Sequence, residues 1–201
     1  MINFIKNEFF KTVKYIKENI LKLTIISGIA FLIIAVASFF LIKLIPEEEL
    51  LAVFKEISAM FDTKGVVNED GSISAFGLFI NNTRAMFIAV VLGMIPFVFW
   101  PFFTLFLNSS LVGVVVGIFD ATTDYNIFYL ILTKLLPHGI FELPALFVST
   151  AMGIKLCIIS SKKIIGKKDL SLKYHLINCL RVFLFIIIPF LILAAIIESS
   201  L

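Results

Sequence analysis

The sequence predicts an all-α integral membrane protein, a polytopic transmembrane helical bundle with about five full spans. Hydrophobic residues make up 60% of the 201 residues and the mean hydropathy is +1.08, whereas soluble domains are closer to half apolar. Several continuous apolar runs reach the roughly 20 residues that a helix needs to cross the bilayer core. The alternating segments typical of a membrane β-barrel do not occur in the sequence. Residues 1–201 are therefore expected to form a single membrane domain.

Residues 1–22 are predicted to form a cytoplasmic amphipathic helix rather than a span. Apolar residues recur there at steps of three and four, namely Ile2, Ile5, Phe9, Val13, Ile16 and Ile20. Lysines occupy other positions of the same helix: Lys6, Lys11, Lys14, Lys17 and Lys22. This pattern suits a helix lying on an anionic membrane surface with its lysines near the headgroups. It suits equally well a helix packed on the protein's own cytoplasmic face, so both alternatives stay open.

Residues 23–44 form the first predicted span. Basic residues before it and Ala35-Val36-Ala37 within it resemble a signal peptide, but the apolar run continues past that point, so we expect an uncleaved helix. Residues 45–80 follow as an outer interfacial segment. Pro46 and the three glutamates after it mark a helix start, and the helix that follows is too short and too charged to cross the membrane.

The stretch from Asn81 to Phe119 is almost twice as long as one span requires. We expect two spans, 81–100 and 102–119, joined by a very short connection near Trp100 and Pro101. The second contains Gly113 and Gly117 at a small-xxx-small spacing, which lets helix backbones approach closely.

The last third of the chain is predicted to contain two further spans and a half-span. Residues 126–136 are apolar but too short to cross, and Pro137, His138 and Gly139 are expected to break the helix. The fourth span covers 139–159, a basic cytoplasmic loop covers 160–177, and the fifth span covers 178–197. Small residues form a second ridge along the fourth span: Ala145, Ser149 and Gly153.

The distribution of charges predicts the orientation of these spans. Lysine-rich segments lie at the N-terminus and in the 160–177 loop, and such segments stay in the cytoplasm. The acidic 45–80 segment, the Asp120/Asp124 loop and Glu198 are then outside. Five spans satisfy all of these assignments, with the N-terminus cytoplasmic and the C-terminus extracytoplasmic.

His138 and Glu142 are the candidate functional residues. They lie four positions apart, so they share one face if the helix begins by Pro137. Ionisable side chains at membrane depth are costly, which makes them functional candidates by default.

Three interpretations of this motif remain open. In a structural one, Glu142 is buried and either protonated or paired with Arg84, Lys134, Asn82 or Asn108. In the second, the motif performs metal or acid–base chemistry, although zinc usually takes three or four protein ligands and the other histidine, His175, is predicted on the opposite side. In the third, the motif lines a polar pocket or pathway for an ion, a lipid headgroup or a small ligand.

The residues around this motif resemble the stage II sporulation protein M family. The similarity is carried by Leu136–Ala145, which reads LPHGIFELPA. Supporting elements are Asn81-Asn82 before the second span, Asn108 followed by Gly113, and Gly153. Ser109 departs from the pattern, where the family has a glycine, and residues 1–75 carry no matching motif. The overall layout agrees over nearly the whole chain.

The resemblance implies a polytopic membrane protein without established catalysis or cofactor. In endospore-forming bacteria the sporulation member is needed for engulfment and anchors two extracytoplasmic cell-wall hydrolases, an amidase and a lytic transglycosylase. We therefore expect a membrane scaffold, with residues 45–80 as the docking surface, no metal, and no nucleic acid partner. The alternative is a transporter or ligand-binding protein with a pocket at His138 and Glu142. The two small-residue ridges also suggest a homodimer.

Overall fold

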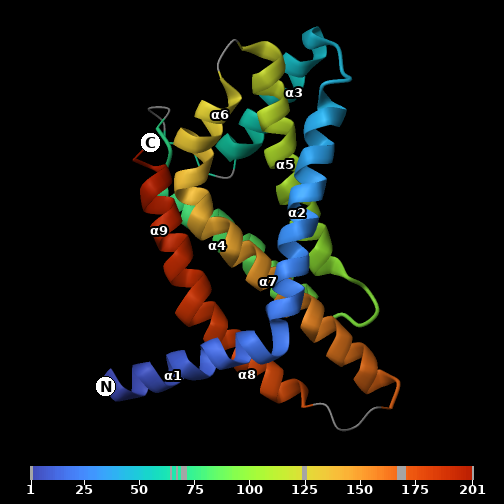
Figure 1. Ribbon diagram of the computed structural model, residues 1–201, viewed down its shortest axis with the longest axis vertical. Helices are drawn as coiled ribbons and strands as arrows, with labels where there is room; N and C mark the ends of the chain where they lie inside the picture. The colour runs from blue at the N-terminus through green and yellow to red at the C-terminus, as the bar shows by residue number, and fades with distance from the viewer. Residues whose placement is uncertain are drawn as a thin grey trace.

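The computed structural model is an all-α bundle (Figure 1), and it describes residues 2–63, 65–66, 68, 72–123, 126–166 and 171–200. The described helices are α1 (Ile2–Tyr15), α2 (Leu21–Ile42), α3 (Glu47–Thr63), α4 (Ala75–Leu92), α5 (Trp100–Thr122), α6 (Ile127–Leu130), α7 (Leu136–Ile164), α8 (Leu172–Val182) and α9 (Ile188–Glu198). Short π-helical segments, Ile16–Ile20, Ile131–Leu135 and Phe183–Ile187, join α1 to α2, α6 to α7 and α8 to α9.

Five of the resulting helical segments are long and apolar enough to cross a membrane, which confirms the predicted fold class. They cover Asn3–Ile42, Ala75–Leu92, Trp100–Thr122, Ile127–Ile164 and Leu172–Glu198. The protein is therefore a multi-pass membrane protein. Helix α3 is not among these segments, and it lies at the end of the bundle opposite α1 and α8 (Figure 1).

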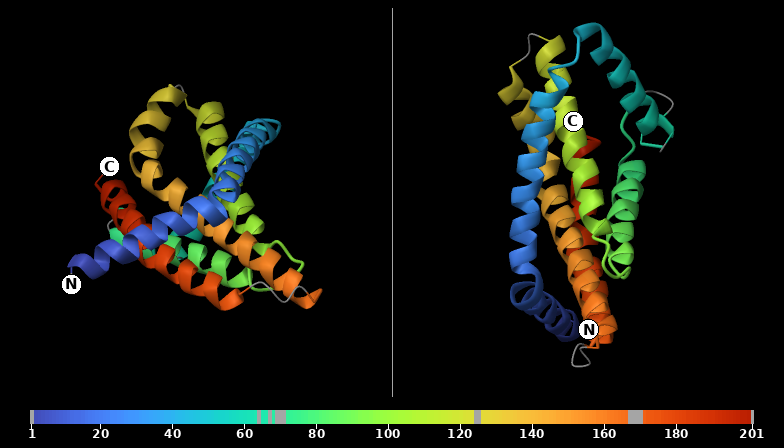
Figure 2. Two further views of the ribbon diagram at one scale, coloured as in Figure 1. Left: turned by 60° about the horizontal axis from the view of Figure 1, so that its bottom comes forward. Right: turned by 90° about the vertical axis from the view of Figure 1, so that its right-hand side faces the viewer.

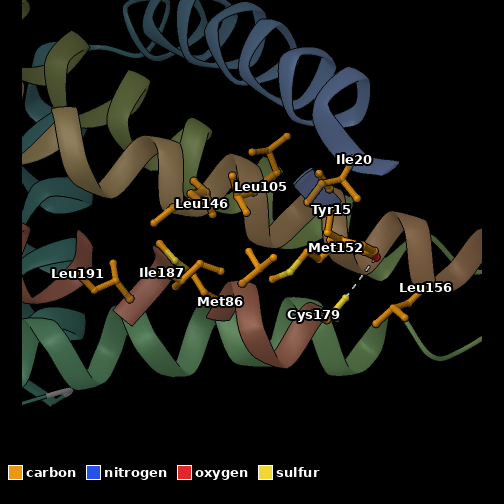
Figure 3. Packing of buried hydrophobic residues seen from close by; sticks show 14 of the residues in the cluster. Tyr15, Ile20, Met86, Leu105, Leu146, Met152, Leu156, Cys179, Ile187 and Leu191 are labelled. Atoms are coloured by element: carbon orange, nitrogen blue, oxygen red, sulfur yellow. Dashed lines mark hydrogen bonds between the residues drawn. The ribbon is translucent and has the colours of Figure 1, made fainter. Parts of the chain in front are cut away.

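Helix α7 is the centre of the bundle and contacts α2, α4, α5, α8 and α9. Its Leu146, Met152 and Leu156 are buried and pack against side chains of the surrounding helices, including Met86 of α4 and Leu191 of α9 (Figure 3). Because lipid tails are as apolar as leucine, the hydrophobic effect contributes little to helix association within the bilayer. Close van der Waals packing of this kind holds the helices together instead.

Two close helix contacts depend on glycine. A Cβ on Gly113 of α5 would overlap the backbone carbonyl oxygen of Ala35 in α2. A Cβ on Gly153 of α7 would overlap the carbonyl oxygen of Ala89 in α4, and Gly93 faces Gly153 equally closely. Helices of the same chain therefore cover both small-residue ridges, so these ridges are not free to pair with a second copy.

The predicted limits of the second span, 81–100, were wrong. The helix begins earlier, at Ala75, because the Oγ of Ser74 caps it by accepting from the backbone N–H of Gly77 at 3.1 Å. It ends at Leu92, and the chain turns through Gly93 and Pro96 before α5 starts. Pro101 does not break a helix as expected, because it lies in the first turn of α5, where the missing N–H costs little.

The predicted half-span 126–136 and the break at Pro137 were also wrong. Asn126 caps a helix that runs without interruption from Ile127 to Ile164. Proline disfavours an α-helix because its ring clashes with the carbonyl four residues earlier, here that of Thr133. That carbonyl lies in the π-helical segment Ile131–Leu135, whose wider turn accommodates the ring without ending the helix.

The predicted basic loop 160–177 is shorter in the structure. Helix α7 continues to Ile164, and α8 begins at Leu172, capped by the hydroxyl of Ser171. The fifth span therefore begins before the predicted residue 178. Some residues of the sequence prediction lie outside the described part of the chain: Glu69, Asp70, Gly71, Asp124, Lys167, Lys168 and Asp169.

Helix α1 lies across the bundle at the end that also holds α8, as two views show (Figures 1 and 2). Its contacts with α8 use polar residues: Glu8, Thr12 and Tyr15 are buried. Its most apolar residues point away from the protein, and Phe4 and Phe10 are 67% and 71% exposed. The polar face of α1 packs against the protein, and its apolar face is free to contact the lipid headgroup region. Both predicted alternatives for this segment are therefore compatible with one helix.

Candidate functional site

His138 and Glu142 meet a third ionisable residue, Glu198, where the start of α7 lies beside the end of α9. One nitrogen of His138 and one carboxylate oxygen of each glutamate all lie within 4.8 Å of one another. The Nε2 atom of His138 lies 3.9 Å from Oε2 of Glu198. We call these three residues the polar cluster.

The local structure explains how the cluster forms. His138 and Glu142 are one turn apart on the same face of α7, as their spacing predicts. Helix α9 packs along α7 and ends at Glu198, which brings that carboxylate level with the first turns of α7. Pro137 and Gly139 flank the histidine within the continuous helix, directly after the π-helical segment Ile131–Leu135.

The cluster is sheltered from solvent but not sealed. The side chains of His138 and Glu198 are 13% and 21% exposed. Nδ1 of His138 is buried, so Nε2 is the nitrogen that faces Glu198. Two carboxyl groups this close repel each other when both are ionised, and buried charges are normally paired or bound to a metal ion. The arrangement therefore requires a shared proton, a charged imidazole or a bound cation.

The asparagine side chains of the predicted site form hydrogen bonds with partners outside the cluster. Asn81 donates to the side-chain oxygen of Asn82 at 3.3 Å, and Asn108 donates to the carbonyl of Thr104 at 2.8 Å. Arg84 is exposed on α4. Among the described residues, no hydrogen bond or ion pair joins Glu142 to Arg84, Asn82 or Asn108. Lys134, the remaining candidate partner, is exposed.

The small residues of the predicted site have packing positions. Gly113 and Gly117 of α5 face α2, and Gly153 of α7 faces α4 and the start of α5. Ala145 and Ser149 of α7 are fully buried. None of these side chains belongs to the polar cluster, so they position helices and contribute no chemistry.

Glu198 is the residue that sequence reasoning did not place in the site. In the sequence interpretation, Glu198 was used only to assign the C-terminus to the extracytoplasmic side. One signal could have identified it: it is the sole ionisable side chain after Arg181, and the predicted topology puts it on the same side of the membrane as His138. The neighbour relationship of α7 and α9, which brings it to the motif, has no local sequence pattern.

Comparison with known proteins places the chain in a family. The sequence model described as "Stage II sporulation protein M" matches residues 12–201, a range that contains the whole polar cluster. The chain belongs to the stage II sporulation protein M family. It is also similar to an uncharacterized protein of Methanocaldococcus jannaschii, with 33% identity over 89 residues. That match covers 44% of this chain and 48% of the relative, about half of its length. No solved structure matches the chain.

Membership of the stage II sporulation protein M family agrees with the helical architecture, because a polytopic membrane bundle is what the resemblance implied. The relative contributes no activity, substrate or partner.

Proposed function

We propose that this protein is a non-enzymatic membrane scaffold that holds extracytoplasmic partners through α3. The observation that supports this role is the position of α3, an amphipathic helix held at the end of the bundle with one face left uncovered. If the source organism forms endospores, the partners are cell-wall hydrolases that act during engulfment.

The inner face of α3 attaches it to the bundle. Leu50 is 1% exposed and packs with Ile42 of α2 and Ile118 of α5. Half-buried Val53 and Ile57 extend this contact. The attachment makes α3 a fixed part of the bundle, which is what a docking platform requires.

The outer face of α3 offers a mixed apolar and charged surface. Leu51 is 55% exposed, and Lys55 and Glu56 are exposed beside it. Interfaces between proteins typically combine an apolar centre with a charged rim. The acidic start of the helix and the distance from the lysine-rich α1 support an extracytoplasmic location for this surface.

Site-specific photo-crosslinking tests the scaffold. A photoreactive residue at position 51 or 55 is expected to capture an amidase or lytic transglycosylase of the source cell, identified by mass spectrometry. Leu32 and Leu184, which are 63% and 55% exposed on spanning helices, are the matched control positions. Capture of the same hydrolase at the control positions, or no capture at positions 51 and 55, would contradict the proposal.

A second candidate function is ligand binding or transport at the polar cluster. It is favoured by one specific observation, the third ionisable group that α9 brings to His138 and Glu142. Glu142→Gln tests it, because this change removes the ionisable carboxyl group while it keeps the side-chain shape. Normal assembly with lost ligand binding supports this function, whereas unchanged binding contradicts it.

A further inference from the structure

We infer that His138, Glu142 and Glu198 form a binding site for a divalent transition-metal ion of the zinc type. This inference does not depend on the scaffold role. It names a ligand class for the polar cluster, for which no metal was expected from the sequence.

The donor set selects this class of ion. One imidazole nitrogen and two carboxylate oxygens suit zinc and its first-row neighbours, whereas magnesium and calcium prefer oxygen ligands alone. Three protein ligands also leave a coordination position for water. The motif in α7 supplies only two of the ligands that zinc usually needs, and Glu198 of α9 supplies the third.

The geometry allows coordination after small movements. Zinc bound tetrahedrally at its usual distances holds its ligand atoms about 3.3–3.6 Å apart. The ligand atoms of the cluster lie within 4.8 Å of one another, and His138 Nε2 and Glu198 Oε2 are 3.9 Å apart. The glutamate side chains have several flexible torsions, and their rotation would bring these atoms closer together.

The charge balance points the same way. At the opposite end of the protein, Glu8 has two cationic partners, Lys11 and Arg181. Within the described part of the chain, no lysine or arginine forms an ion pair with Glu142 or Glu198. A dication would neutralise both carboxylates in this sheltered position, and burial makes such neutralisation more valuable than at an exposed site.

The site would also link two helices. Its ligands come from the beginning of α7 and the end of α9, so a bound metal ion would pin the C-terminal end of the bundle to the central helix. Metal binding to the native state stabilises a protein by mass action. The melting temperature is therefore a readout of binding that needs no assay of function.

Zinc titration of the full-length protein in detergent tests the inference. The protein is stripped with EDTA, transferred to chelator-free buffer and titrated with ZnCl₂ by isothermal calorimetry, with MgCl₂ as the comparison. We expect one zinc per chain and no saturable magnesium binding. Zinc should raise the melting temperature, and Co²⁺ should give the visible absorption bands of nitrogen-and-oxygen coordination.

Glu198→Gln and His138→Gln are the decisive variants, because each removes one ligand at a partly accessible position. We expect zinc affinity to fall by about 100-fold or more in each, since even an outer-shell change can cost 10–100-fold. His175→Gln and Glu18→Gln, which alter a histidine and a glutamate outside the cluster, should bind zinc like the natural protein. Circular dichroism and gel filtration establish that each variant is folded.

Two results would overturn the inference. One is the lack of saturable zinc binding by the folded natural protein, which would leave a shared proton or a charged imidazole to hold the carboxyl groups together. The other is zinc binding that Glu198→Gln and His138→Gln leave unchanged, which would locate the ion elsewhere.

Discussion

Arg181 of α8 donates from Nε to Oε2 of Glu8 in α1 at a distance of 2.6 Å. The same carboxylate accepts from Lys11 at 2.6 Å, and the hydroxyl of Tyr15 lies 2.9 Å from Nδ1 of His175. The Arg181–Glu8 and Tyr15–His175 contacts fasten α1 to α8, whereas the Lys11–Glu8 pair lies within α1. Because they occupy the polar face of α1, its phenylalanines remain exposed and available to the membrane.

Loss of the Arg181 contact should release α1. In Arg181→Ala, Glu8 loses its partner on α8, and we expect amide hydrogen exchange over residues 3–15 to become about tenfold faster, because local opening controls exchange. Hydrogen exchange with mass spectrometry in detergent measures this change. Lys14→Ala is the control, since its pair with Glu18 is 3.9 Å long and exposed on both sides. Equal exchange in both variants would argue against this contact as the fastener.

Substitution by alanine should affect the two glycines Gly153 and Gly139 of α7 differently. Gly153→Ala is expected to destabilise the protein by about 2 kcal/mol, because overpacking a tight contact with backbone atoms typically costs 1–3 kcal/mol. In Gly139→Ala the new Cβ would meet nothing closer than Leu143 Cδ1 at 3.8 Å. We expect that variant to be neutral or stabilised by about 0.5–1 kcal/mol, the usual gain of alanine over glycine within a helix.

Reversible unfolding in detergent compares the two glycine variants. A Gly153→Ala variant as stable as the natural protein would show that the helix contacts at Gly153 are looser than the structure indicates.

The orientation can be measured with single cysteines. A membrane-impermeant maleimide should label Lys55→Cys on α3 in intact cells, and it should label Lys163→Cys at the end of α7 only after permeabilisation. This expectation follows from the lysine-rich end, which the positive-inside rule places in the cytoplasm. The native Cys157 and Cys179 are buried and give little background. The reverse pattern of labelling would invert the proposed topology.

The five spans could be predicted from the sequence because membrane helices are recognised by their high hydropathy, which is a local property. Their ends were harder to predict, for reasons that particular residues illustrate. Pro101 predicts the end of a helix, yet a proline is tolerated in the first turn of α5. Pro137 followed by Gly139 predicts a helix break even more strongly, yet the π-helical turn before it lets the helix continue. A proline limits a helix only where the surrounding backbone cannot adapt.

The sequence by itself determined that this chain is a helical membrane protein and that His138 and Glu142 share a helix face, since both properties depend on composition and spacing. Only the tertiary structure decided that Glu198 joins them and that the glycine ridges are covered by α2 and α4. The reason is physical. Inside a bilayer all apolar helix faces are nearly equivalent in hydrophobicity, so the shapes of the packed surfaces select each helix's neighbours.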